Sequence, residues 1–287
     1  MRVSRNQEDF ESGVHGSALE VAAAEAVPTP IETGLRPVDV PEGPAIEYRL
    51  IGTDIQFVEI DLPPGQEMIA EAGAMTSMDE NIKFSAILGD NPDSSVVGKF
   101  FSAGKRLLAK ESFLLTRFQN MSDSESQEVV FAAPYPGRII PVDLSLCDGV
   151  LYCQKGAFLC ATRKTRINVS VTRRIAAGLW GGEGFILTKI EGDGIVFVHA
   201  GGTIIKKEVD GRKLRVETGS VVGFTRGLDY SVEPITNIKS LLFGGEGCFL
   251  TTFTGNGTVY LQSLPFKTLC RRIFQNTPED LLRAGRG

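Results

Sequence analysis

A segment rich in apolar residues around a glutamate recurs three times in the 287-residue chain, and this recurrence constrains the fold most. The copies read LLAKESFLLTRFQ (107–119), LWGGEGFILTKIE (179–191) and LFGGEGCFLTTFT (242–254). Each has a threonine five positions after its glutamate: Glu111 and Thr116, Glu183 and Thr188, and Glu246 and Thr251. If each copy belongs to a β unit of roughly sixty to eighty residues, the three units cannot each bury both faces alone, so they must pack together as one body.

A second strand pattern follows each copy: EVVFAAPYPGRIIPVDL, GIVFVHAGGTIIKKEV and GTVYLQSLPF. GDG (192–194) and GNG (255–257) connect the two strands in the second and third copies, whereas the first copy has the longer loop QNMSDSESQ. Glycine with Asp or Asn supplies the positive φ that tight hairpins require. We therefore expect a hairpin at each of the two G-x-G sequences.

A further strand pattern precedes each copy: EMIAEAGAMTSM, LYCQKGAFLCAT and LRVETGSVVGFT, which align on Gly73, Gly156 and Gly219. The last two glycines are 63 residues apart, the same separation as between the glutamates of copies two and three. The chain contains 32 glycines, and each glycine inside a helix costs about 1 kcal/mol relative to alanine. The equal separation indicates an internal repeat, and the glycine content disfavours a helix-rich fold.

The sequence thus predicts an all-β fold: three tandem β-sandwich or double-stranded β-helix-like repeats, packed as one pseudo-threefold body with short helical turns. Residues 1–44 hold 3 basic and 8 acidic side chains and several prolines, which is typical of a disordered acidic leader. The predicted boundaries are a leader at 1–44, a triplicated β domain at 45–275 (repeats at about 46–144, 150–209 and 213–266) and a C-terminal tail at 276–287.

The second and third copies, GGEGFILTKIEGDGIVFVHAGG and GGEGCFLTTFTGNGTVYLQSLPF, resemble the mitochondrial biogenesis family of the altered-inheritance-of-mitochondria type. The resemblance covers about residues 46–270, although the first copy reads AKES in place of GGEG. It implies a fold like that of the tryptophan RNA-binding attenuation protein and a link to membrane organisation. It supplies no catalytic residues.

Glu111, Glu183 and Glu246 are the candidate ligand-binding residues. If the copies are related by pseudo-threefold symmetry, these carboxylates occupy equivalent places, and on convergence they would hold a hard cation or the polar end of a ligand. The structural alternative is that each accepts hydrogen bonds from backbone N–H groups of its own glycine-rich turn. We favour the structural role, because a feature of every repeat copy is more often structural.

The run RKTRINVSVTRR (163–174) is the candidate contact for an anionic partner. Strand alternation places Ile167, Val169 and Val171 inward and directs the polar residues between them outward. The alternative is an edge strand whose charges block pairing with another sheet. The basic residues concerned are Arg163, Lys164, Arg166, Arg173 and Arg174.

Cysteine and histidine give little support for chemistry at a site. The five cysteines contain no C-x-x-C pair, and Cys153, Cys160 and Cys248 fall in strand patterns typical of buried, inert thiols. His199 follows an apolar strand pattern, without ligand-type neighbours in the sequence, and is expected to be structural. We predict no catalytic residues, no metal site and no cofactor.

Near the C-terminus, PFKTLCRRIFQ carries apolar residues at helical spacing: Phe266, Leu269, Cys270, Ile273 and Phe274. Such a stripe docks either on its own domain, which we favour, or on a membrane surface.

These features together indicate a non-enzymatic β-rich scaffold or binding protein that forms a homo-oligomer and binds a protein partner or, peripherally, a membrane surface. The alternatives are a cupin-like module that binds a metal or small molecule, and an RNA-binding protein by fold analogy. Outside the leader, 27 basic residues balance 27 acidic ones, so nucleic acid is not an expected partner. Without a signal segment or a long apolar run, we expect a cytoplasmic protein.

Overall fold

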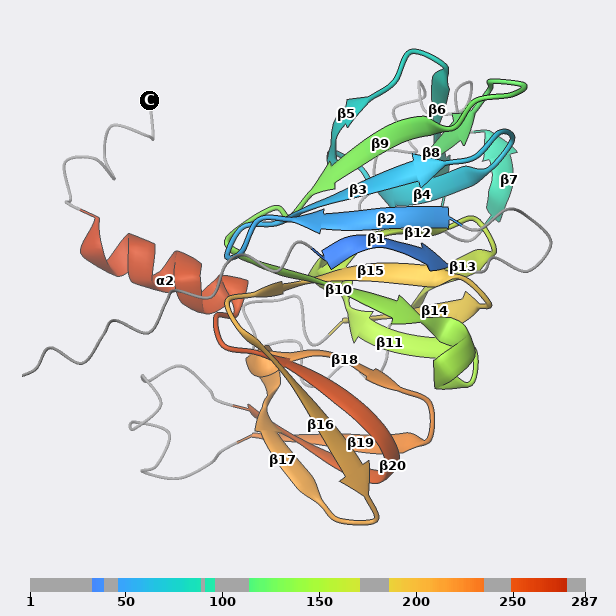
Figure 1. The fold of residues 1–287 in the computed structure, drawn as a ribbon. Helices are drawn as coiled ribbons and strands as arrows, with labels where there is room; N and C mark the ends of the chain where they lie inside the picture. Colours follow the sequence, from blue (N-terminus) through green and yellow to red (C-terminus); the bar gives the residue numbers. More distant parts are fainter. Residues whose placement is uncertain are drawn as a thin grey trace, which may run out of the picture. The chain divides into compact units, whose positions relative to one another are not determined.

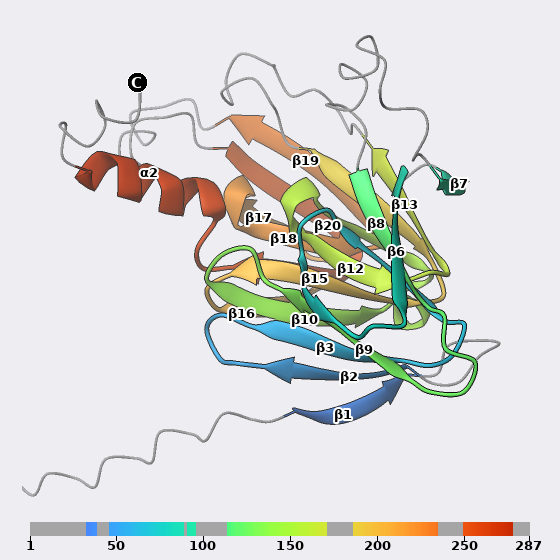
Figure 2. The ribbon, with the colours of Figure 1, turned by 90° about the horizontal axis from the view of Figure 1, so that it is seen from above.

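The computed structural model describes residues 33–38, 46–88, 91–95, 114–170, 186–234 and 249–277. All of them lie in one compact unit, Glu32–Gly287. Most of them form β-strands, and the strands curl into connected sheets (Figures 1 and 2).

The elements are, in chain order, β1 (Thr33–Val38), β2 (Ile46–Ile51), β3 (Phe57–Leu62), β4 (Glu67–Glu71), β5 (Met75–Met78), β6 (Ile82–Leu88), β7 (Asn91–Ser95), β8 (Leu114–Asn120), β9 (Gln127–Ala132), β10 (Gly137–Asp143), η1 (Leu144–Cys147), β11 (Val150–Gln154), η2 (Lys155–Ala157), β12 (Phe158–Thr162), β13 (Thr165–Ser170), β14 (Leu187–Gly192), β15 (Ile195–Gly201), β16 (Ile204–Asp210), β17 (Leu214–Glu217), η3 (Thr218–Ser220), β18 (Val221–Thr225), β19 (Leu228–Pro234), β20 (Phe249–Gln262) and α2 (Phe266–Asn276).

Three sheets organise these strands, and every strand pair is antiparallel apart from one isolated parallel bridge. Five strands pair in the order β1-β2-β3-β9-β5, and seven in the order β10-β15-β12-β4-β8-β6-β7. The third sheet has the order β13-β14-β11-β18-β20-β16, and β17 and β19 pair with the remaining part of β20. The prediction of a mostly β protein with short helical turns is confirmed.

Corresponding strands of the three stretches pair alike. In the first stretch β4 and β6 flank β8, while β3 and β5 flank β9. In the second, β11 and β13 flank β14, while β10 and β12 flank β15. In the third, β17 and β19 flank the first half of β20, while β16 and β18 flank its second half. The recurrence concerns strand pairing and does not place the stretches around an axis.

The predicted hairpins at GDG and GNG are wrong. The strands on either side of GDG, β14 and β15, belong to different sheets, and GNG lies inside the single strand β20. At GDG the chain turns a corner from one sheet to another, and at GNG it turns a corner within β20, from the partners β17 and β19 to the partners β16 and β18. Gly192 has φ +139° and Gly255 has φ +105°, and an added Cβ would lie 2.2 Å from the Lys164 carbonyl oxygen and 2.3 Å from that of Gly227, respectively. Positive φ therefore serves a corner here instead of a hairpin.

The strand patterns aligned on glycine also divide in two. Gly73, Gly156 and Gly219 each separate two strands, β4 from β5, β11 from β12 and β17 from β18. The strands β4 and β5 have different partners, and so do β11 and β12, whereas β17 and β18 pair with the first and second halves of β20. A short turn at each glycine, with 3-10 helices at the last two positions, redirects the chain to these new partner residues.

Part of the expected leader, residues 33–38, is described and forms a strand. Thr33–Val38 forms β1 and pairs with β2, so this part of the range 1–44 belongs to the five-stranded sheet. A proline-punctuated segment is compatible with an edge strand, where one side of the backbone needs no partner. The rest of the predicted leader, and residues 278–287 of the predicted tail, lie outside the described residues.

The core includes β12, β15 and β18, in which every residue is buried. Phe197 of β15 packs edge-on against Tyr48 of β2, with 5.0 Å between ring centroids, and lies in one cluster with Ile60 and Phe131. Phe158 of β12 lies in a second cluster that includes Val196 and Leu151. A strand that is covered on both faces is mostly apolar instead of alternating, and β15, IVFVHAG, is apolar apart from His199.

Candidate functional site

The three repeated glutamates, Glu111, Glu183 and Glu246, lie outside the described residues, so their roles stay predictions. Two of the threonines that accompany them, Thr188 and Thr251, are fully buried. The Thr251 hydroxyl lies 2.9 Å from that of Thr218, which donates to the Phe249 carbonyl. These threonines therefore belong to the interior of the β body.

A different glutamate accepts hydrogen bonds from turn amides. Glu217 Oε1 accepts from Gly219 N at 2.9 Å, and Oε2 accepts from Ser220 N at 2.8 Å and from the Ser220 hydroxyl at 3.1 Å. Sequence reasoning missed this residue, although a signal was present: Glu71, Gln154 and Glu217 each stand two positions before an aligned glycine. Gln154 connects two stretches by donating to the Thr218 carbonyl at 3.2 Å.

The basic run has carboxylate neighbours within the fold. Arg163 Nη1 lies 3.1 Å from Oε2 of Glu67, whose side chain is only 6% exposed. Arg166 is exposed on β13, opposite Glu191 in the strand register, while Ile167 is buried as the alternation predicts. Arg173 and Arg174 lie outside the described residues. In the sheet, β13 occupies an edge, which fits the alternative of a charged strand edge.

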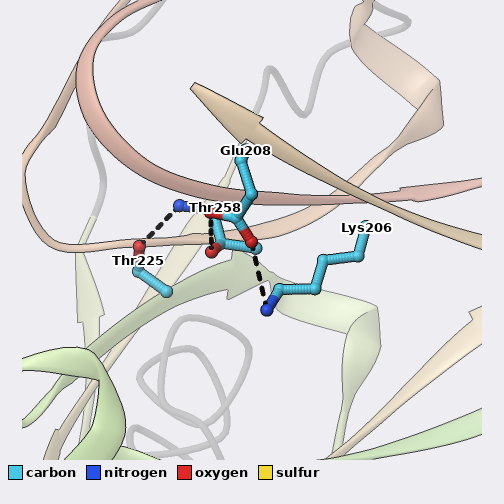
Figure 3. A network of polar contacts seen from close by, with 4 residues as sticks. All are labelled: Lys206, Glu208, Thr225 and Thr258. Carbon is cyan, nitrogen blue, oxygen red and sulfur yellow. Dashed lines mark hydrogen bonds and ion pairs between the residues drawn. The ribbon is translucent and has the colours of Figure 1, made fainter. Parts of the chain in front are cut away.

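A network of hydrogen bonds and one ion pair lies beside the corner at GNG (Figure 3). The Thr258 hydroxyl donates to Glu208 Oε2 at 2.9 Å, and the Thr258 backbone N–H donates to the Thr225 hydroxyl at 2.9 Å. Lys206 lies 3.1 Å from Glu208 on the same strand, β16. The hydrogen bond from Thr258, followed by the contact with Lys206, lowers the pKa of Glu208. The network ties the edge strand β16 to β20.

Two thiols in the core have low reactivity. Cys153 and Cys160 are fully buried and free, as predicted. Burial raises the pKa of Cys153 to about 12 and that of Cys160 well above its usual value. Because the thiolate is the nucleophile and the metal ligand, neither thiol reacts readily at neutral pH. Cys248 lies outside the described residues.

His199 is buried in β15 beneath an aromatic contact. Its ring lies edge-on to Tyr135, with 4.2 Å between centroids, and burial lowers its pKa to about 4. Burial, assisted by Glu71, raises the pKa of Tyr135 to about 12. Both side chains are neutral at physiological pH. Among the described residues, no group of three or more His, Cys, Asp or Glu side chains is arranged to hold a metal ion.

The Tyr135 ring also contacts the first residue of α2, with 4.8 Å between its centroid and that of Phe266. The segment before the helix is hydrogen-bonded to the end of β15 and to the connection between β15 and β16. Leu264 N donates to the Gly201 carbonyl at 3.1 Å, and Ser263 N donates to that of Thr203 at 3.0 Å. A Cβ at Gly201 would lie 2.0 Å from the Leu264 carbonyl oxygen, so this close approach requires glycine. The helix thus begins on a well-defined base.

The expectation that the apolar stripe docks on its own domain is wrong for most of its length. No residue of α2 is buried in the part of the chain that the structure describes. Phe266, Ile273 and Phe274 are 49%, 56% and 64% exposed. In both ribbon views α2 leaves the sheets after β20 (Figures 1 and 2). The chain therefore presents an amphipathic helix with exposed apolar side chains, and the segment that precedes it, Ser263–Pro265, is hydrogen-bonded to Gly201 and Thr203. None of the described helices is both long enough and apolar enough to span a membrane.

Comparison with known proteins identifies relatives of the chain. Residues 48–264 match the family model described as mitochondrial biogenesis AIM24. An uncharacterized protein of Streptococcus pyogenes serotype M6 is 31% identical over 219 residues, which cover 75% of this chain and 84% of that protein. A crystal structure of a protein from Streptococcus pyogenes shares the fold, with a TM-score of 0.63 and 23% identity, over 81% of this chain and 100% of that one.

Proposed function

The chain belongs to the mitochondrial biogenesis AIM24 family, and we propose that it is a non-enzymatic β-rich scaffold or binding protein. The helix α2 engages its partner. The observation that carries this proposal is the exposure of Ile273 and Phe274 at the far end of a helix whose base is bonded to Gly201 and Thr203. An exposed apolar surface on a fixed support is typical of an interaction site.

Polar side chains of the body support a scaffold role. Glu217, Gln154 and Gln262 each bond backbone groups of turns or neighbouring strands. Arg163 faces the buried Glu67, and Glu208 is bonded within its own corner. These groups hold strands together. Burial raises the pKa of Cys153 and Cys160 and lowers that of His199, which keeps all three side chains neutral at physiological pH.

The recurring strand pairing supports a finer proposal about architecture. We infer that the three stretches are copies of one unit, packed as a pseudo-threefold body similar to the fold of the tryptophan RNA-binding attenuation protein. The pairs β4–β12 and β11–β18 join successive copies within continuous sheets. We also propose that the protein works in the cytoplasm as a small homo-oligomer, in which strand edges pair between chains.

Site-specific photo-crosslinking in cells tests the binding function. The variant Phe274→p-benzoylphenylalanine places the probe on α2, and Leu146→p-benzoylphenylalanine places it on η1, where the native leucine is 84% exposed. We expect adducts, with protein or lipid, from position 274 and few from position 146. A probe at 274 that yields no adduct above the level seen at 146 would contradict the function.

A further inference from the structure

We propose that α2 is an interfacial anchor that lies in the surface of membranes rich in anionic lipid. This inference rests on the proposed function, because it names the partner of that helix. It is drawn from the placement of apolar and basic side chains on α2, from their exposure and from the way the helix is held.

The residues of α2 separate cleanly around its axis. With about 100° between successive residues, the apolar side chains span an arc of roughly 140°. The other side chains fill the remaining arc. The apolar arc consists of Leu269, Ile273, Phe266, Cys270 and Phe274, and the polar arc of Lys267, Arg271, Gln275, Thr268, Arg272 and Asn276.

The exposed apolar side chains are of the kind that enters a lipid interface. Phe266, Ile273 and Phe274 are each about half exposed or more, and together they represent both ends of the helix. A helix that uses its apolar face only for packing against its own body would bury these residues. Interfacial helices instead place Phe, Leu and similar residues at the boundary between lipid headgroups and acyl chains.

Charge identifies the lipid class. The polar arc carries Lys267, Arg271 and Arg272, and α2 contains no acidic residue. Lys267 and Phe274 occupy adjacent directions on the helical wheel, so a basic residue borders the apolar arc. Each such cation near an anionic surface raises affinity about fivefold. An anionic bilayer complements both faces of the helix at once, whereas an apolar protein groove complements one.

The segment before α2 and the first residue of the helix fix where the helix begins on the β body. Backbone hydrogen bonds from Ser263 and Leu264 to Thr203 and Gly201, together with the contact of Phe266 with Tyr135, hold the first turn against the body. Exposure is continuous from Arg272 to Asn276. The helix can therefore lie on a surface with its C-terminal half while the β body stays in water.

Co-sedimentation of the full-length protein with vesicles tests the proposal. Vesicles of equal parts phosphatidylcholine and phosphatidylglycerol are compared with vesicles of phosphatidylcholine alone. We expect binding to the anionic vesicles, weaker binding as salt is raised, and little binding to the neutral ones. The variant Ile273→Ser/Phe274→Ser, which changes only exposed side chains, should lose about tenfold or more in affinity.

A matched pair of charge variants separates α2 from general charge attraction. Arg271→Gln/Arg272→Gln should lose about tenfold or more, whereas Arg212→Gln/Lys213→Gln removes the same charge from exposed residues of the body and should stay within about twofold of wild type. Leu146→Ser is the corresponding control for the apolar change. Equal losses from both charge pairs, or unchanged binding of Ile273→Ser/Phe274→Ser, would overturn the proposal.

The two proposals fail differently. One outcome is that the wild-type protein does not bind anionic vesicles, while the probe at position 274 crosslinks a protein or a second copy of the chain. In that case the membrane inference is wrong and the binding function stands. If vesicle binding and crosslinking are both absent, both are wrong.

Discussion

His199 occupies a strand in which all seven residues are buried, and its ring packs against Tyr135. Protonation would place a charge in this apolar surrounding, which is why its pKa falls to about 4 from the ordinary 6.5. The unfolded chain binds this proton below about pH 6.5, but the folded protein binds it only near pH 4. Stability contributed by His199 is therefore complete above pH 6.5 and decreases as the pH falls toward 4.

We predict that this linkage contributes up to about 3 kcal/mol to the loss of unfolding free energy between pH 6.5 and 4. The variant His199→Phe keeps an aromatic ring and removes the titration. Urea unfolding at several pH values should give a flatter pH dependence for the variant than for wild type. Parallel curves across this range would show that His199 does not couple folding to protons.

Glu217 provides a second prediction about a single residue. Its carboxylate accepts both turn amides, Gly219 N and Ser220 N, in the manner of a helix cap. Glu217→Ala should lower the free energy of unfolding by about 1 kcal/mol, and Glu217→Gln, which keeps one acceptor oxygen, by less. Chemical denaturation measures both, and the account of this turn is contradicted if Glu217→Ala has the denaturation midpoint of wild type.

At the scale of elements, the turns at GDG and GNG show which structural features a local sequence pattern can predict and which it cannot. The sequence patterns correctly predicted strand segments, because alternation is a local property of the sequence. They did not distinguish a hairpin at GDG or GNG from a corner, since both need positive φ at glycine and only the partner strands differ. Ile167 was correctly placed inward, but the role of Glu217 depends on a turn that spacing alone did not assign.

The corner at Gly255 is open to a direct test. Alanine at this position combines an unfavourable positive φ with a Cβ that would lie 2.3 Å from the Gly227 carbonyl oxygen. We expect Gly255→Ala to destabilise the fold by about 1–3 kcal/mol or more. Gly211→Ala is a matched control, because Gly211 also has positive φ (+65°) but no atom within 4 Å of the added Cβ. Thermal unfolding should show the larger loss for Gly255→Ala; equal losses would mean that the close approach is unimportant.

The helix α2 illustrates the opposite limit of sequence reasoning. Helical spacing predicted its existence and its apolar face, and Phe266–Asn276 confirms the helix. Where such a stripe docks depends on the surface that other segments offer, which the stripe itself does not contain. Because Ile273 and Phe274 are exposed, we propose that this face contacts a partner instead of its own domain.

For the whole molecule, assembly is the first test. Strands β5, β13 and β16 each pair on one side only within their described sheets, and unpaired edges are sites where chains associate. We predict a small homo-oligomer in sedimentation equilibrium. A mass of 31.0 kDa that does not change with concentration would instead indicate a monomer.

The central claim for the whole molecule is that a firmly packed β body presents α2 for a partner. An 11-residue helix without a buried side chain has little to stabilise it, whereas β12 and β15 are buried throughout. Amide hydrogen exchange of the full-length protein, with and without phosphatidylglycerol vesicles, measures both regions at once. For the free protein we expect rapid amide hydrogen exchange in α2 and slow exchange in β12 and β15. On the vesicles, we expect protection from exchange to increase in α2 alone. Exchange in free α2 as slow as in β15 would contradict it.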